Sequence, residues 1–236
     1  MRYALYYWSG IQGRGEFVRL ALEDAGADYT DVARERGDEA LSAFLDGDQA
    51  GALPFAPPFL KAGRQVIAQT SNILHYLGPT LRLVPGAEPA RLYAQQLQLT
   101  IADVVAEVHD SHHPIAASAY YADQRAPASR RAADLRKTRL PKFLHYFERV
   151  LERGGGRHAL RQHSYVDLSL FQLMVGLDYA FPRAMRRMQR QLPLLQALQH
   201  RVAERPPIGA YLASARRVAF NQSGIFRHYP ELDDPR

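Results

Sequence analysis

The sequence contains no cysteine among its 236 residues. This absence excludes disulfide bonds, thiolate metal ligands and a cysteine nucleophile. Any thiol chemistry must therefore use a sulfur atom that a substrate brings.

Long hydrophobic runs are also lacking. The most apolar segment, residues 166–181, is interrupted by Asp167, Gln172 and Asp178, whereas a membrane span needs about 18 or more apolar residues in succession. The first five residues lead into a strand-like pattern without an apolar targeting segment or a small-residue cleavage site. We therefore expect no membrane partner and a cytoplasmic location.

The sequence has no basic run with interleaved aromatic residues, although its net charge is +6. The basic residues are nearly all arginine and are spread along the chain. We expect no nucleic-acid partner, and an anionic small substrate fits the positive charge equally well. The hydrophobic content of 47% is ample for the core of one large or two small domains.

Strand and helix patterns alternate through the first eighty residues. Strand patterns cover residues 2–8 and 28–33, and helix patterns begin at residue 14 and at residue 39. Three prolines within residues 51–58 exclude a helix and predict an ordered loop. A hairpin over residues 59–68 and a helix over residues 70–77, ending at Gly78-Pro79, complete a predicted α/β domain of residues 1–80.

After a linker rich in proline at residues 79–89, only helical patterns follow. They cover residues 90–112, 134–153, 168–179, 192–203 and 207–215. Ser164 and Asp167 have the spacing of a capping box before a helix that is apolar nearly all round and therefore expected to be buried. We predict an all-helical domain over residues 90–236 that ends in an irregular tail, and we assign Asp167 to capping rather than catalysis.

Several features resemble the cytosolic glutathione transferases in their order and spacing. They are Tyr7 at the end of the first strand, Gly13-Arg14 at the first helix, Pro58, Gln69-Thr70 eleven residues later, and Ser164-x-x-Asp167. The pattern is most similar to the tyrosine-type branch, with its sigma and pi classes, and to a bacterial member of it. The resemblance implies an α/β thioredoxin-like domain followed by an all-α domain.

The resemblance also implies a function. The chain would be a detoxifying enzyme that joins the thiol of glutathione to hydrophobic electrophiles, with glutathione peroxidase as a side activity. Glutathione would be a co-substrate, with no further cofactor and no metal, and the protein would be a homodimer. The alternative is a non-catalytic protein of the same fold that binds glutathione or a hydrophobic ligand, because a fold alone does not establish a reaction.

Tyr7 receives the catalytic role from this resemblance. A free thiol has a pKa of about 8.5, so a phenol that donates a hydrogen bond to the sulfur of glutathione favours the reactive thiolate. Tyr6 and Tyr7 point to opposite faces of the strand, and only Tyr7 matches the family's distance from the chain start. Alignment of the next Gly-Arg pair needs one extra residue within residues 9–12, so Tyr6 and Ser9 remain alternatives.

Gln69 and Thr70 stand at a helix start, where unpaired N–H groups and the helix dipole favour a carboxylate. The resemblance implies that they hold the γ-glutamyl end of glutathione, although Thr70 also suits an ordinary N-cap. Arg14 either supports the same end or is a surface charge. Asp103 is a polar residue on a helix face that resembles the acidic residue reaching the γ-glutamyl amine in the neighbouring subunit.

Pro58 resembles the family's cis proline, and the residue before it, here Pro57, would bind the cysteinyl part of glutathione through its backbone. Since Pro57 has no N–H, only its carbonyl group can bind, unless the local register differs by one. Tyrosine-type relatives hold the glycine end with a Trp and a Lys near the second helix. Those residues are missing here, and Arg34 or Arg36 could replace them.

The electrophile pocket is expected between the first-strand loop, the region of residues 109–121 and the tail. We assign Trp8, His113 and Tyr120 to its lining. His109 and His113 are four residues apart on a predicted helix, which also fits a metal pair. No acidic partner is evident in the sequence, so we expect pocket residues there and no metal site.

Overall fold

The computed structural model describes residues 2–47 and 52–233. Its sheet contains β1 (Tyr3–Tyr6), β2 (Tyr29–Asp31), β3 (Phe59–Ala62) and β4 (Gln65–Ala68) in the order β2-β1-β3-β4. Strand β1 is parallel to β2 and antiparallel to β3, and β3 forms a hairpin with β4. The alternation of strands and helices and the hairpin are as predicted.

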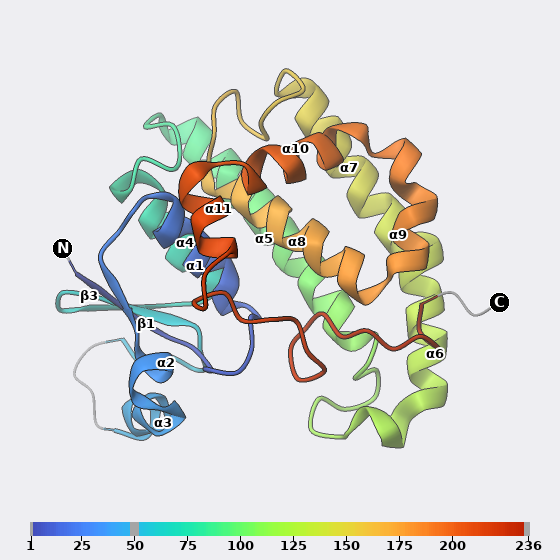
Figure 1. Ribbon diagram of the computed structural model, residues 1–236, viewed down its shortest axis with the longest axis horizontal. Helices are drawn as coiled ribbons and strands as arrows, with labels where there is room; N and C mark the ends of the chain where they lie inside the picture. Colours follow the sequence, from blue (N-terminus) through green and yellow to red (C-terminus); the bar gives the residue numbers. More distant parts are fainter. Residues whose placement is uncertain (1, 48–51, 234–236) are drawn as a thin grey trace.

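Helices cover both faces of this sheet (Figure 1). On one face, α1 (Gly15–Asp24) and α4 (Thr70–Thr80) bury Val18, Leu22 and Ile73 against strand residues. On the other face lie α2 (Val32–Arg36) and α3 (Asp38–Asp46). The ring of Tyr6 stacks on Phe59 there, at 4.5 Å between centroids.

The second part of the chain is helical. Helix α8 (Tyr165–Ala180) lies at its centre, and all but three of its residues are buried, as the apolar pattern predicted. Around it lie α5 (Glu88–Asp110), η1 (Tyr121–Gln124), α6 (Arg125–Asp134), η2 (Leu135–Arg139), α7 (Leu140–Arg153), α9 (Pro182–Met188), η3 (Gln189–Gln191), α10 (Pro193–Ala203) and α11 (Pro206–Leu212). None of the helices in the described ranges is long and apolar enough to cross a membrane.

Several element boundaries differ from the prediction. The second strand is shorter, because residues 32–36 form α2. Helix α4 continues through Gly78 and Pro79, since a proline in the last turn removes only one backbone donor. Gly78 is required for packing instead, because a side chain there would approach the ring of Tyr165 to 2.8 Å. The helical region expected from residue 134 begins at residue 125, and α9, which starts at a proline, was not predicted.

The capping box at the start of α8 is confirmed. Asp167 is fully buried and accepts hydrogen bonds from the backbone N–H groups of Ser164 (2.8 Å) and Ala159 (2.9 Å). The hydroxyl group of Ser164 also donates to it. One carboxylate therefore connects the loop before α8 to the first turn of that helix.

The tail, residues 213–233, contains no helix or strand and crosses the molecule from α11 toward α6 (Figure 1). His112 holds it by donating from Nε2 to the carbonyl oxygen of Ile225 at 2.8 Å. The rings of Tyr121 and Tyr229 stack at 3.9 Å, and the Tyr121 hydroxyl donates to Glu231. The tail is therefore packed against the helical domain.

Substitution of Asp167 by Ala is expected to lower the free energy of unfolding by about 2 kcal/mol, because it removes a cap and leaves two buried N–H groups without an acceptor. Denaturant unfolding of the parent and variant measures the difference. Glu88→Ala, at an exposed first-turn position of α5, is the matched control and should change stability by less than about 0.5 kcal/mol. Equal effects of the two substitutions would contradict this role of Asp167.

The stability of the protein is expected to depend on pH through His112. Burial lowers the pKa of His112 to about 3, whereas an unfolded histidine has a pKa of about 6.5. The unfolded chain therefore binds the extra proton first, and the contribution of neutral His112 to stability is lost as the pH falls from 6.5 toward 3. In His112→Gln, the amide can still donate to Ile225 but does not titrate. The stability advantage of the parent should shrink below pH 6.5 by about 1 kcal/mol per pH unit, and a constant difference from pH 7 to pH 5 would contradict the prediction.

Candidate functional site

Tyr7 lies directly after β1, and its side chain is only 4% exposed. Its hydroxyl oxygen accepts a hydrogen bond from the backbone N–H of Arg14 at 2.9 Å. Two glycines make this approach possible. A β-carbon at Gly13 would lie 1.9 Å from the hydroxyl oxygen, and one at Gly15 would lie 2.4 Å from the ring.

The environment of Tyr7 keeps its phenol neutral. Burial raises the pKa of Tyr7 above its ordinary value, while the N–H of Arg14 and the positive charges of Arg14 and Arg19 act in the opposite direction. The guanidinium group of Arg19 lies 5.6 Å from the centre of the Tyr7 ring. Since the oxygen accepts from Arg14 and the proton is retained, the phenol can donate a hydrogen bond to a ligand.

The start of α4 is joined to the same turn. The hydroxyl group of Thr70 donates to the carbonyl oxygen of Arg14 at 3.3 Å. Gln69, which precedes the helix, has a φ angle of 70°, a left-handed conformation that costs about 1 kcal/mol or more in a residue other than glycine. Tyr7, Arg14 and Thr70 are thus connected in series by backbone and side-chain contacts.

Arg14, Gln69 and Thr70 also line one small cavity of about 60 Å³. Helix α5 forms the opposite wall with Gln98, Ile101, Ala102 and Val105, and Phe17 completes the lining. The first turn of α4 and the Arg14 side chain therefore meet at a site between the two domains. Asp103 follows this wall on α5 and is exposed.

The loop before β3 contains the two prolines singled out in the sequence. The peptide bond between Pro57 and Pro58 is cis, as predicted, and Phe59 begins β3 immediately afterwards. Pro58 is therefore the cis proline of this loop, which agrees with the alignment that places Pro57, and not a residue one position away, before it.

Arg34, one of two candidates for the glycine end of glutathione, is engaged elsewhere. Its guanidinium donates to the carbonyl oxygens of Ala215 (2.9 Å) and Arg216. Arg34 thus connects α2 to the beginning of the tail. No local pattern indicates this contact, because its partners are more than 180 residues away.

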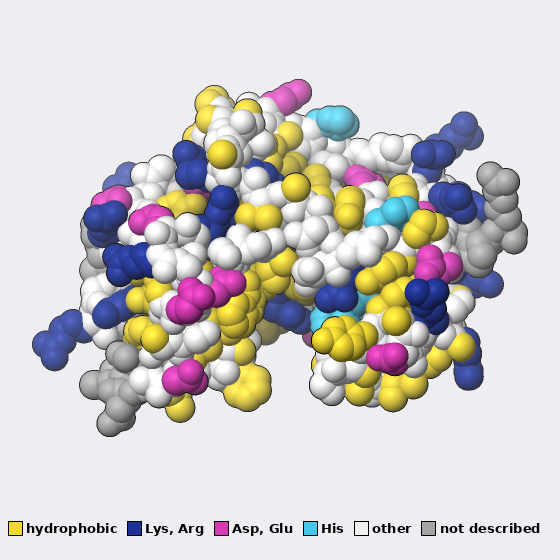
Figure 2. Space-filling view, turned by 60° about the horizontal axis from the view of Figure 1, so that its bottom comes forward, with side chains coloured by type: hydrophobic (Ala, Val, Ile, Leu, Met, Phe, Trp, Pro, Cys, Tyr) yellow, Lys and Arg dark blue, Asp and Glu magenta, His cyan; other side chains and the backbone are white. Residues whose placement is uncertain are grey.

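The tail links the segments from which an electrophile pocket was expected. Asn221 donates from its side chain to the carbonyl oxygen of Gly10 at 2.8 Å, and the tail then reaches His112 at Ile225. Trp8 is 38% exposed in the first loop, residues 7–14, and Tyr120 is 80% exposed on the loop after α5. Figure 2 shows a hollow between two lobes of the molecule, with hydrophobic side chains on its walls and basic and histidine side chains inside it.

The three neighbouring histidines pack against one another, with ring centroids 4.8 to 5.4 Å apart. His113 contacts the carbonyl oxygen of Ala119 through Nδ1 at 3.0 Å, and His109 contacts Asp110 at 3.2 Å. Together with the bond from His112 to Ile225, these contacts fix the loop after α5 and the tail. The structure gives the cluster a packing role.

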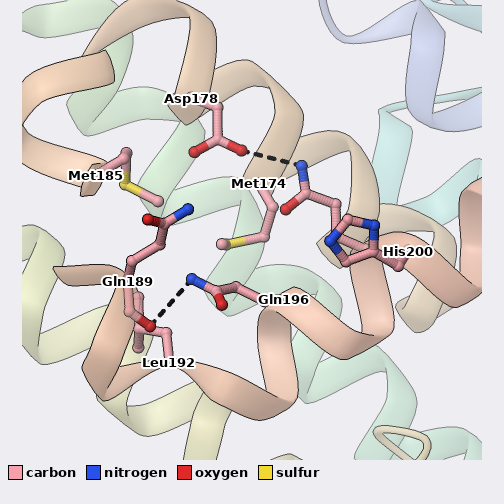
Figure 3. A pocket seen from close by; sticks show the side chains of 8 residues that line it. Met174, Asp178, Met185, Gln189, Leu192, Gln196 and His200 are labelled. Carbon is pink, nitrogen blue, oxygen red and sulfur yellow. Dashed lines mark hydrogen bonds between the residues drawn. The ribbon is translucent and has the colours of Figure 1, made fainter.

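Other polar clusters lie away from Tyr7. His163 and Arg205 both bind Asp24 of α1, at 2.8 and 2.6 Å, and so join the two domains. A separate cavity of about 210 Å³ lies among α8, α9 and α10 (Figure 3), where Gln199 donates to Asp178 at 2.9 Å. The lining of this cavity includes none of the predicted site residues.

Residues 109–215 match a family model described as "Glutathione S-transferase, C-terminal domain". Among curated proteins, glutathione S-transferases of Plasmodium yoelii yoelii and Plasmodium falciparum are each 22% identical to the chain. These matches cover 89% and 92% of this chain and 92% and 97% of the relatives. Glutathione S-transferase P of Bos taurus is 27% identical, over 92% of this chain and 94% of its own length.

Solved structures agree with these matches. A pi-class glutathione S-transferase of Onchocerca volvulus superposes with a TM-score of 0.70 at 26% identity, covering 90% of this chain and 92% of its own. Prostaglandin synthase D of Nilaparvata lugens also has a TM-score of 0.70, over 91% of this chain and 98% of its own, and at 18% identity it shows the fold alone. The chain has the glutathione S-transferase fold, and residues 109–215 match the C-terminal domain of that family.

Proposed function

We propose that the chain is a tyrosine-type glutathione transferase in which the Tyr7 hydroxyl stabilises the thiolate of bound glutathione. The observation that carries this proposal is the 2.9 Å hydrogen bond from the Arg14 N–H to the Tyr7 oxygen. It occupies the oxygen as an acceptor and leaves the phenolic proton for donation to sulfur. Neither Tyr6, which stacks on Phe59 on the other face of the sheet, nor Ser9, whose N–H binds Asp38, offers an equivalent arrangement.

The reaction needs no covalent bond to the protein. The thiol of glutathione loses its proton to solvent, the resulting thiolate attacks the electrophile, a carbon–sulfur bond forms and the leaving group departs. Each unit by which Tyr7 lowers the pKa of the thiol corresponds to about 1.4 kcal/mol of thiolate stabilisation. Because its own pKa is raised, Tyr7 keeps its proton while it does so. Attack of the same thiolate on a hydroperoxide would break the O–O bond, release the alcohol and leave the sulfenic acid of glutathione, which a second glutathione would convert to the disulfide with release of water; this would be the peroxidase side activity.

The γ-glutamyl carboxylate of glutathione is proposed to bind at the start of α4. Gln69 and Thr70 lie at the positive end of the helix dipole, and Arg14 lines the same cavity. The backbone carbonyl of Pro57 would bind the cysteinyl part, with one hydrogen bond fewer than a residue with an N–H could make. Pro58 fixes the direction of that carbonyl. Glutathione is a co-substrate in this proposal, and no cofactor takes part.

The hydrophobic electrophile is proposed to bind in the hollow beside the tail (Figure 2). Trp8 would contribute from the first loop, and His113 and Tyr120 from the loop after α5. Partial exposure of Trp8 leaves an apolar surface for such a ligand. A role in detoxification and a cytoplasmic location complete the proposal.

A homodimer is proposed from the apolar side chains that the chain leaves exposed. Phe55 is 93% exposed and Leu53 is 75% exposed on the loop before β3, and Leu92 and Leu99 are 60% and 51% exposed on α5. The two leucines of α5 are seven residues apart and therefore share one helix face. Asp103 is one turn beyond Leu99 on the same face, which would bring it toward the glutathione bound by the partner subunit.

Substitution of Tyr7 by Phe tests the catalytic proposal. It removes a hydrogen bond to a charged sulfur, which is worth about 1.5 to 3 kcal/mol, so kcat/KM for conjugation should fall by about 10- to 100-fold. Conjugation of glutathione to an activated chloronitrobenzene measures the change. Tyr6→Phe is the matched control, since it keeps the ring stacked on Phe59, and it should retain the parent rate. An unchanged rate in Tyr7→Phe would contradict the catalytic role of Tyr7. A parent protein that binds glutathione without conjugating it would favour the non-catalytic alternative.

Substitution of Phe55 by Asp tests the dimer. A charged carboxylate in an apolar interface should shift the protein from dimer to monomer in sedimentation velocity at micromolar concentration. Ile115→Asp, at a residue that is 72% exposed on the loop after α5, serves as the control and should leave the dimer intact. A parent protein that sediments as a monomer would overturn the proposed dimer, and loss of the dimer in Ile115→Asp alone would place the interface elsewhere.

A further inference from the structure

A buried polar network lies beneath the first loop, and the catalytic proposal does not use it. At its centre is the carboxylate of Glu16 on α1, which is fully buried. It accepts a hydrogen bond from the hydroxyl group of Tyr211 at 2.8 Å and pairs with the guanidinium groups of Arg19 and Arg217. Arg19 also pairs with Asp31 at 2.6 Å, so two basic and two acidic side chains balance one another.

Arg217 belongs to the tail, yet its guanidinium reaches both domains. One nitrogen pairs with Glu16 of α1, and another donates to the side-chain oxygen of Gln172 on α8 at 3.1 Å. Gln172 donates in turn to the side-chain oxygen of Gln12 in the first loop at 2.8 Å. Gln12 donates to the backbone carbonyl of Val218, the residue after Arg217. These bonds form a closed ring of contacts between the tail, α8 and the first loop.

The first loop sets the position of the N–H group that binds Tyr7. It runs from Tyr7 to Arg14. The buried guanidinium group of Arg19 donates to the carbonyl oxygens of Ile11 (3.3 Å) and Gln12 (3.4 Å) in this loop. The side chain of Gln12 is held only by Gln172 and Val218 among the contacts of the described residues. Arg217 contacts Gln172 through its guanidinium group, and it is covalently joined to Val218, the next residue in the chain. It therefore helps to position both partners of Gln12.

We propose that Arg217 is a positioning residue for the thiolate site. This role rests on the proposed function: through Arg217 the tail stabilises the first loop and thereby the hydrogen bond from Arg14 to Tyr7. Without the Arg217 guanidinium, Gln172 loses a donor, Gln12 loses its oriented partner, and Glu16 keeps only Arg19 and Tyr211. The Arg14 N–H then holds the phenol less well, and the thiol of bound glutathione ionises at a higher pH.

The adjacent Arg216 provides a matched comparison. It is 60% exposed and forms a two-bond pair with Glu23, at 2.9 and 2.7 Å. Glu23 lies near the end of α1, two turns away from Glu16 and from the first loop. The guanidinium of Arg216 also lies 5.8 Å from the centre of the Tyr211 ring, as that of Arg217 does at 5.9 Å, but among the described residues it forms no hydrogen bond with Gln12, Gln172 or Glu16.

The experiment compares the pH profiles of kcat/KM for Arg217→Ala, Arg216→Ala and the parent enzyme, with glutathione and an activated chloronitrobenzene. For Arg217→Ala, the rising limb should move to higher pH by about half a unit to one unit, and kcat/KM at pH 6.5 should fall about 3- to 10-fold. The profile of Arg216→Ala should match that of the parent. A substitution that only lowers stability would change the amount of folded enzyme but would not move the limb.

Gln12→Ala keeps the Glu16–Arg217 pair and removes the hydrogen bonds from the first loop to Gln172 and Val218. This variant tests the positioning role if Arg217→Ala fails to fold. Its rising limb should move in the same direction. Folded Arg217→Ala or Gln12→Ala with the profile of the parent would overturn the inference while leaving the proposed function intact. A parent without conjugating activity would overturn the proposed function, and this inference with it.

Discussion

The hydrogen bond from the backbone of Arg14 to the hydroxyl oxygen of Tyr7 is the contact on which the site depends. It requires a loop that returns to the end of β1, two glycines without side chains against the phenol, and a helix that starts at residue 15. Thr70 then joins α4 to the same Arg14. The Tyr7 hydroxyl, proposed to bind the sulfur of glutathione, and the start of α4, proposed to bind its carboxylate, are therefore both positioned by Arg14.

The two domains meet through polar groups as well as through apolar packing. Asp24 with His163 and Arg205, and Glu16 with Tyr211 and Arg217, connect α1 to the helical domain. Buried charges of this kind are tolerated because each one is paired and hydrogen-bonded. Such pairs specify one relative position of the domains, which a purely apolar interface would define less sharply. The position of the proposed thiolate site is thus determined partly by the helical domain.

Local patterns were enough to predict the features that depend on near neighbours. The capping box of Ser164 and Asp167 follows from residues within a few positions, and so does the first strand, which ends directly before Tyr7 rather than at it. The cis bond before Pro58 was expected from the resemblance to the glutathione transferases. Contacts across long sequence separations could not be found in this way. Glu16 and Arg217 are 201 residues apart, and in the sequence one resembles an ordinary first-turn acid and the other a surface charge in an irregular tail. Helix α9 was missed because Pro182 resembles a break, although proline also suits the first position of a helix.

A neutral Tyr7 is proposed to stabilise the thiolate of glutathione bound at this site. The most direct measurement is the ultraviolet absorbance of the thiolate in the complex of protein and glutathione, followed as the pH is raised. If Tyr7 has this role, the thiol of bound glutathione should have a pKa at least one unit below the free thiol value of about 8.5. Binding of glutathione with ionisation at the free value would contradict this role.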